Sequence, residues 1–124
     1  MSDNHIAIID DDEPFRTALL ESVSSLGYWA DGFASGEDFM RQPVRGIYDV
    51  IVTDIHMPGI SGLELMEQLA ALGSPTPVVL ITARSESALP ARARAAGAIC
   101  LLTKPFELEE LVKCLETAVD KSTR

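Results

Sequence analysis

The stretch Val78-Val79-Leu80-Ile81 decides the fold class of this 124-residue chain. It is an unbroken aliphatic run between Pro77 and Thr82, and its shortness indicates a strand that is buried on both faces. Strands of this kind are typical of parallel sheets that helices cover on both sides, whereas antiparallel strands usually alternate apolar and polar residues. The run therefore predicts an α/β domain built on a parallel sheet.

Further apolar runs lie on either side of this strand, and they predict strands at residues 5–9, 28–33, 48–53 and 98–102. Helical spacing of apolar residues follows each strand, in segments that open at Pro14, Ser35, residue 65, Pro90 and Leu108. Five strands alternating with five helices predict a single doubly wound (βα)5 domain of the flavodoxin-like type, with every strand buried on both faces. We expect residues 1–124 to form one domain, with 119–124 as a frayed tail or the start of a linker.

Composition and charge argue against several classes of protein. Apolar residues make up 47% of the chain and charged residues 23%, as is usual for a globular protein, and the net charge of −9 argues against direct binding of nucleic acid. The apolar runs are too short to cross a membrane, and the first five residues lack the pattern of a signal peptide. Cys100 and Cys114 lack zinc-site spacing and are expected to be reduced thiols. These features predict a cytoplasmic protein without membrane contacts.

Polar residues follow directly after the predicted strands. Asp10 and Asp11 follow the first strand, Asp54 the third, Thr82 the fourth and Lys104 the fifth. Ligands of α/β sheets bind at this carboxyl edge, where three carboxylates repel one another unless a cation neutralises them. Oxygen ligands without histidine or cysteine favour Mg²⁺, and a lysine with a threonine can hold phosphoryl oxygens. The set predicts Mg²⁺-dependent phosphoryl transfer to a carboxylate, which would form an aspartyl phosphate.

The same residues also have structural explanations. Asp12 and Glu13 beside Pro14 are expected to cap a helix rather than to bind a ligand. Any one of the other acids, taken alone, could be a solvated loop residue or a turn residue. Their joint placement with a lysine and a threonine at one sheet edge favours a functional site.

Four stretches carry a resemblance to a known family: residues 8–14, 52–65, 80–83 and 102–106. They occur in the order and at the spacing found in receiver domains of bacterial two-component response regulators, and they are most like the FixJ-like branch. The resemblance extends from end to end of the chain and implies the strand order 2-1-3-4-5.

The resemblance also implies a role for each acid of the site. It makes Asp54 the phosphoacceptor and a metal ligand, Asp11 a direct Mg²⁺ ligand, and Asp10 an acid that acts mainly through a metal-bound water. The backbone carbonyl of His56 resembles the third protein ligand of the ion. Mg²⁺ is thus the expected cofactor.

Of the family's other typical residues, the threonine and the lysine are present and the aromatic residue is absent. Thr82 is similar to the switch hydroxyl of the family, and Lys104 to its invariant lysine. Leu101 stands where many receivers have Tyr or Phe, so the aromatic half of the usual switch is missing. His56 and Arg84, each two residues beyond the acceptor or the threonine, are expected at the mouth of the pocket, where they would control the lifetime of the phosphoryl group.

The resemblance implies a regulatory protein, not an enzyme, that takes its phosphoryl group from a sensor histidine kinase. It places an output surface on residues 90–96, 98–102 and 108–119, for an output domain, a partner protein or a second copy of the chain after phosphorylation. The output is expected to be transcription through a C-terminal DNA-binding domain, with a stand-alone regulator as the alternative. A remote alternative is a Mg²⁺ phosphohydrolase of the haloacid-dehalogenase type, whose Asp-x-Asp motif residues 10–13 satisfy only in part.

Overall fold

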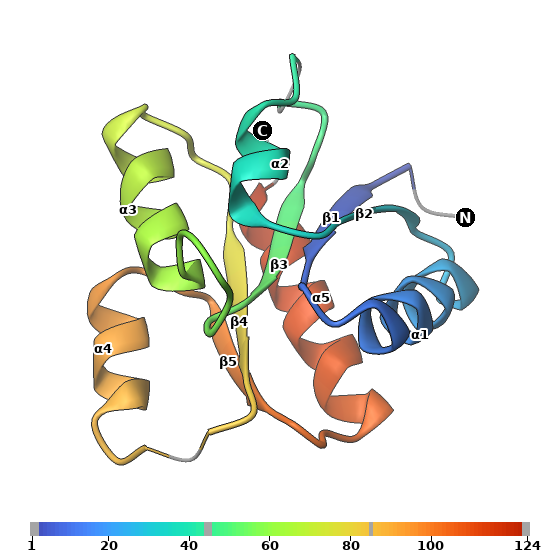
Figure 1. Cartoon of the computed structure of the whole chain (residues 1–124). Helices are drawn as coiled ribbons and strands as arrows, with labels where there is room; N and C mark the ends of the chain where they lie inside the picture. Colours follow the sequence, from blue (N-terminus) through green and yellow to red (C-terminus); the bar gives the residue numbers. More distant parts are fainter. Residues whose placement is uncertain (1–2, 44–45, 85, 123–124) are drawn as a thin grey trace.

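Five parallel strands form the centre of the structure (Figure 1). In the computed structural model, which describes residues 3–43, 46–84 and 86–122, they are β1 His5–Ile9, β2 Trp29–Phe33, β3 Val50–Asp54, β4 Val78–Thr82 and β5 Cys100–Thr103. Their order is β2-β1-β3-β4-β5, and each neighbouring pair is parallel. The predicted fold class and strand order are confirmed. The order reverses direction between β1 and β3, which is where α/β sheets of this kind bind ligands.

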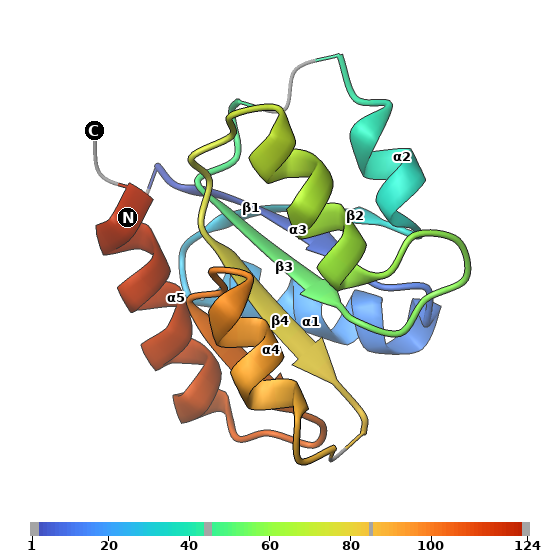
Figure 2. The ribbon, with the colours of Figure 1, turned by 90° about the vertical axis from the view of Figure 1, so that its left-hand side faces the viewer.

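Five helices cover the two faces of the sheet: α1 Glu13–Ser25, α2 Gly36–Met40, α3 Gly62–Ala71, α4 Leu89–Ala95 and α5 Leu108–Ser122. α1 and α5 lie on one face, and α2, α3 and α4 lie on the other (Figures 1 and 2). Within the described residues, no helix is both long enough and apolar enough to span a lipid bilayer.

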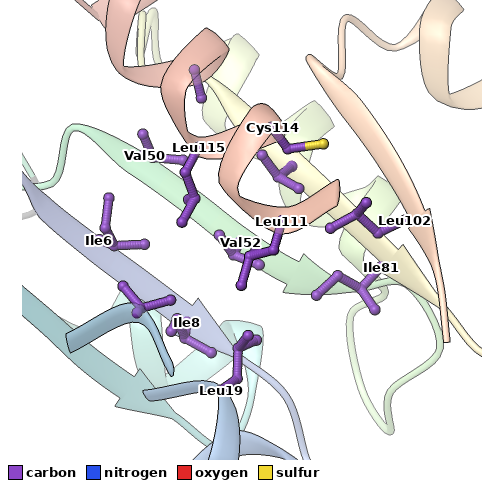
Figure 3. Close-up of a cluster of buried hydrophobic side chains, with 13 residues drawn as sticks. Ile6, Ile8, Leu19, Val50, Val52, Ile81, Leu102, Leu111, Cys114 and Leu115 are labelled. Atoms are coloured by element: carbon purple, nitrogen blue, oxygen red, sulfur yellow. The ribbon is translucent and has the colours of Figure 1, made fainter. Parts of the chain in front are cut away.

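Alternate residues of the central strands supply two separate cores, because successive side chains of a strand point to opposite faces. On one face, Ile8, Val52 and Ile81 pack against Leu111 and Leu115 of α5 (Figure 3). On the other face, the core under α2, α3 and α4 consists of Ala7, Ile9, Ile51, Val78, Leu80, Phe39, Leu65 and Leu89, with further residues of those helices. Both cores anchor the carboxyl ends of β1, β3 and β4 rigidly.

The edge strand β2 differs from the prediction that every strand is buried on both faces. Trp29, Asp31 and Gly32 are exposed, with Trp29 at 58%. β2 is at the edge of the sheet and has a neighbouring strand on one side only. The helices therefore cover its residues less completely than those of the central strands. The continuous burial predicted for all strands is correct for β3 and β4, whose residues are all buried.

The ends of the helices follow the sequence signals at most positions. The Asp12 carboxylate accepts a hydrogen bond from the Phe15 N–H (3.3 Å) and caps α1, and the Ser35 hydroxyl caps α2 in the same way. α4 begins at Leu89 with Pro90 in its first turn, as predicted. Residue 85, in the connection between β4 and α4, lies outside the described residues.

α5 departs from the prediction at both ends. Leu108, expected in the buried stripe, is its first residue and is 52% exposed, because it lies at the margin of the helix–sheet contact. The helix continues through Ser122, so residues 119–122 are helical and not frayed, and the start of a linker in this region stays a prediction. Residues 123 and 124 lie outside the described part of the chain.

Gly62 shapes the loop that follows β3. Its N–H donates to the Ile55 carbonyl (2.9 Å), and a Cβ at this position would lie 2.5 Å from the carbonyl oxygen of Asp54. Only glycine permits such an approach of one backbone to another. α3 therefore starts directly against the end of β3, where the Ser61 and Glu64 side chains form a capping box.

Candidate functional site

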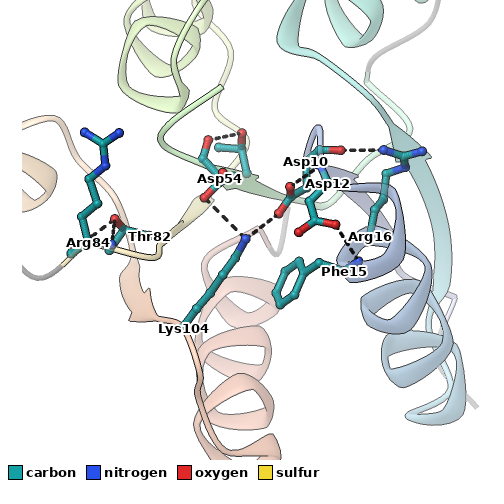
Figure 4. Close-up of polar contacts among 9 residues, drawn as sticks. Asp10, Asp12, Phe15, Arg16, Asp54, Thr82, Arg84 and Lys104 are labelled. Carbon is teal, nitrogen blue, oxygen red and sulfur yellow. Dashed lines mark hydrogen bonds and ion pairs between the residues drawn. The ribbon is translucent and has the colours of Figure 1, made fainter. Parts of the chain in front are cut away.

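An acidic cluster lies at the carboxyl ends of β1 and β3, and Figure 4 shows two of its members, Asp10 and Asp54. Asp54 is the last residue of β3, and Asp10 and Asp11 follow β1, its neighbour in the sheet. One carboxylate oxygen from each residue lies within 4.8 Å of the other two. Asp10 and Asp54 are buried and Asp11 is exposed, so the cluster opens to solvent beside Asp11.

Lys104 supplies the positive charge opposite these acids. It follows β5, which is separated from β3 by β4, and its side chain reaches back toward the acids (Figure 4). Its Nζ lies 3.1 Å from Asp10 Oδ2 and 3.9 Å from Asp54 Oδ1. The Lys104 ammonium is therefore directly paired with Asp10, whereas its distance to Asp54 is too long for a hydrogen bond.

Asp54 is held in a state that disfavours its negative charge. Burial raises the pKa of Asp54 to about 6, and the nearby Asp10 and Asp11 carboxylates act in the same direction, while Lys104 and the Ile55 N–H lower the pKa. Asp54 Oδ1 is buried and accepts no hydrogen bond from any described residue. A buried, unpartnered carboxylate oxygen among other acids is the kind of group that a cation stabilises.

Thr82 and its neighbours occupy the loop after β4. The buried Thr82 hydroxyl accepts a hydrogen bond from the Arg84 N–H (3.0 Å) and donates to the Arg84 carbonyl (3.2 Å). The hydroxyl thus forms its hydrogen bonds within its own loop. The Arg84 side chain points away from Asp54 (Figure 4), which contradicts its expected place at the pocket mouth.

Glu86, and not Arg84, faces His56. His56 Nε2 lies 4.0 Å from Glu86 Oε1, and this nitrogen is buried without a hydrogen-bond partner among the described residues. Glu86 was not predicted because it lies in an irregular segment without a recognisable pattern. The role of the His56 backbone carbonyl as a metal ligand stays a prediction.

One contact from α1 and one from its N-cap residue fix the conformation of Asp10. Arg16 Nη1 donates to the Asp10 carbonyl (2.7 Å), and the Asp12 N–H donates to Asp10 Oδ1 (2.9 Å). These contacts orient Asp10 Oδ2 toward Lys104. The sequence offers no signal for the contact of Arg16, since an arginine in a helix is ordinarily solvated.

Comparison with known proteins agrees with this geometry. Residues 6–116 match the response regulator receiver domain family. The chain belongs to this family. It is therefore a receiver domain of a two-component response regulator, a family of regulatory phosphoacceptors without enzymatic turnover, and the haloacid-dehalogenase alternative does not apply.

Individual relatives support the same assignment. The receiver domain is 32% identical to the transcriptional regulatory protein FixJ of Bradyrhizobium diazoefficiens over 93% of its own length and 56% of the relative. It superposes on the crystal structure of FixJ-N with a TM-score of 0.88, at 32% identity and with 97% and 96% of the two chains covered. The receiver domain spans about half the length of the curated relatives that it matches.

A third relative concerns the acidic cluster. The structure of TrrA from Thermotoga maritima, in complex with Mg²⁺ and beryllium fluoride, superposes with a TM-score of 0.81 at 30% identity, covering 93% of this receiver domain and 98% of TrrA. In the present receiver domain, the cluster of Asp10, Asp11 and Asp54 fits a magnesium ion. It offers hard oxygen ligands only, and it includes the unpartnered Asp54 oxygen.

Removal of one carboxylate tests this fit. We expect Asp11→Asn to weaken Mg²⁺ binding by at least about tenfold, as measured by isothermal titration calorimetry, because an exposed ligand is lost while the buried pair remains. Asp12→Asn is the matched control, since it removes the same charge one residue away and asparagine caps a helix equally well. Equal weakening in both variants would contradict ligation and indicate general electrostatic attraction.

The raised pKa of Asp54 predicts a pH dependence of stability without metal. The native state holds its proton up to about pH 6, whereas the unfolded chain releases it near 3.8, so the stabilising contribution is present below pH 3.8 and is lost as pH rises through 6. Between pH 4 and 7 we expect wild type to lose about 2 kcal/mol relative to Asp54→Asn in urea unfolding with a chelator. A difference between the two proteins that stays constant over this range would contradict the prediction.

Proposed function

We propose that this receiver domain accepts a phosphoryl group on Asp54 from a phosphohistidine of a sensor histidine kinase, in a Mg²⁺-dependent reaction. One observation carries the proposal. The buried Asp54 carboxylate has an unpartnered oxygen and lies between two further carboxylates and the Lys104 ammonium. The carboxylates are suited to bind a metal ion, and the metal ion and the lysine together are suited to neutralise the negative charge of a phosphoryl group on Asp54.

The transfer needs an ionised Asp54. An oxygen of its carboxylate forms a bond to the donor's phosphorus while the phosphorus–nitrogen bond of the phosphohistidine breaks, and the imidazole leaves with the electron pair of that bond. Lys104 Nζ, 3.9 Å from Asp54 Oδ1, is close enough to donate to an oxygen of the incoming phosphoryl group. Asp10 holds the ammonium in that position through the 3.1 Å contact.

A bound Mg²⁺ would offset the repulsion between the incoming phosphoryl oxygens and the acidic cluster. Asp11 and Asp54 would hold the ion directly with their carboxylates, Asp10 would act mainly through a water on the ion, and the backbone carbonyl of His56 is the third proposed protein ligand. A bound cation would stabilise the charge of Asp54 and would lower its pKa from the metal-free value of about 6.

Thr82 is proposed to report the phosphorylation. Its hydroxyl would leave the Arg84 backbone and donate to a phosphoryl oxygen, which releases two hydrogen bonds that now shape the loop before α4. The proposed output surface comprises α4, β5 and α5, for an output domain, a partner protein or a second copy of the chain. Because Leu101 replaces the aromatic residue of many receivers, the loop itself has to carry the signal.

We propose control of transcription in the cytoplasm, through a C-terminal DNA-binding domain, as the output. The support is that FixJ is a transcriptional regulatory protein and that this chain spans about half of it. A stand-alone regulator that acts through partner proteins is the alternative. Binding of the full-length gene product to DNA, with and without phosphorylation, separates the two outputs.

Intact-mass spectrometry after incubation with acetyl phosphate tests the proposed function. With Mg²⁺, we expect the mass of one added phosphoryl group, because a small donor bypasses the kinase. With a chelator in place of Mg²⁺, we expect no adduct, because the acidic cluster repels the donor. An equal adduct with and without the metal, or none with it, would contradict the proposal.

A further inference from the structure

We infer that Phe15 is a positioning residue for Lys104: its ring holds the ammonium between Asp10 and Asp54 by a cation–π contact. Lys104 Nζ lies 3.9 Å from the centroid of the Phe15 ring. In Figure 4 the ring lies beside the end of the lysine side chain, on the side away from Asp54. A cation at this distance is attracted by the negative face of an aromatic ring.

The contact supplies a restraint that the two acids do not supply. Of the two acids, Asp10 lies within hydrogen-bond distance of Nζ, with Oδ2 at 3.1 Å, whereas Asp54 Oδ1 is 3.9 Å away. A lysine side chain has four rotatable bonds, so one hydrogen bond leaves it free to swing toward solvent. The Phe15 ring, 3.9 Å from Nζ, adds a second attraction that opposes such a movement.

The Phe15 ring is itself held in place. Phe106, from the segment after β5, packs edge-on against it, with 6.2 Å between the ring centroids. Both rings line a groove of about 240 Å³ between α1 and the start of α5, together with Ala18, Leu19, Pro105 and Leu111. Phe15 of α1 thus contacts the lysine, and Phe106 of the β5–α5 connection supports the Phe15 ring.

The inference rests in part on the proposed function, since it assigns Phe15 an effect on phosphoryl transfer through Lys104. Phe15→Leu keeps an apolar side chain and removes the ring, while Phe15→Tyr keeps the ring and has room in the adjoining groove. We expect Phe15→Leu to lower the rate of phosphorylation by acetyl phosphate about two- to fivefold, and Phe15→Tyr to restore it. Mg²⁺ affinity should stay nearly unchanged, because the Phe15 side chain has no oxygen or charge with which to ligate the ion.

Two measurements distinguish the positioning of Lys104 by Phe15 from a merely structural role of Phe15. In a Lys104→Met background, Phe15→Leu should cause no further loss of rate, because the cation is gone. In wild type, NMR should show the terminal methylene protons of Lys104 upfield of those of Lys113 and Lys121, the two other lysines of the chain, owing to the ring current of Phe15. This shift should vanish in Phe15→Leu and persist in Phe15→Tyr.

The NMR measurement decides the contact independently of phosphorylation. Methylene shifts of Lys104 equal to those of the two other lysines would overturn the inference, even if wild type takes up a phosphoryl group. An equal loss of rate from Phe15→Leu with and without Lys104 would also overturn it. Conversely, an upfield Lys104 in a protein that accepts no phosphoryl group would support the contact and contradict the proposed function alone.

Discussion

Asp54→Asn is expected to abolish phosphoryl uptake from acetyl phosphate in the presence of Mg²⁺. The amide has no negative charge with which to attack phosphorus, and the neighbouring Asp10 is engaged by Lys104 at 3.1 Å. The variant should remain folded, because the amide replaces a buried carboxylate whose charge is disfavoured by burial and by the two neighbouring acids. Intact mass should show no adduct under conditions in which wild type carries one phosphoryl group.

Asp12→Asn controls for the loss of a charge at the same sheet edge. Asp12 caps α1 and asparagine caps equally well, so this variant should still take up one phosphoryl group. A full adduct on Asp54→Asn would show that another residue is the acceptor. In that case, peptide mapping of the adduct would identify the acid that replaces Asp54 in the account.

Lys104→Met is expected to slow phosphorylation by acetyl phosphate by about 100-fold or more, the cost of removing one preorganised donor from a developing charge. Methionine retains much of the apolar stem of the lysine and loses the ammonium that lies 3.1 Å from Asp10 and 3.9 Å from Asp54. Without that cation, the acids repel the donor more strongly. The rate is measured from the growth of the phosphorylated mass with time.

Lys113→Met is the matched control, since Lys113 is exposed on α5 and the substitution is chemically the same. Its phosphorylation rate should equal that of wild type. A comparable slowing in the two variants would indicate that net charge, rather than the placement of Lys104, governs the reaction. An unchanged rate in Lys104→Met would exclude the lysine from the transfer.

The central part of the fold was predictable because burial alone explains it. β3 and β4 are buried throughout, so their unbroken aliphatic runs identify them without reference to distant residues. β2 was predicted less well, because its exposure depends on its position at the sheet edge, which is a property of the topology. The burial of Leu108 was predicted wrongly for a related reason. Helical spacing predicts which face of a helix is apolar, but not where the sheet beneath that face ends.

The candidate site was predictable to the extent that it follows from the ends of strands. Asp10, Asp11, Asp54 and Lys104 come together because parallel strands end at one edge of the sheet. Contacts made by side chains from helices and irregular loops were not predictable in this way. Phe15 packs against the core from α1, as its helical spacing would predict, but that spacing gives no sign that its ring also contacts the Lys104 ammonium.

The most direct test of the account is a crystal structure of this receiver domain with Mg²⁺ and beryllium fluoride, a mimic of the phosphoryl group. The account predicts the ion among the carboxylates of Asp10, Asp11 and Asp54, and the beryllium fluoride on Asp54 with a fluorine within hydrogen-bond distance of Lys104 Nζ. A cluster that holds neither the ion nor the fluoride at saturating concentrations, or a fluoride bound to another residue, would contradict it.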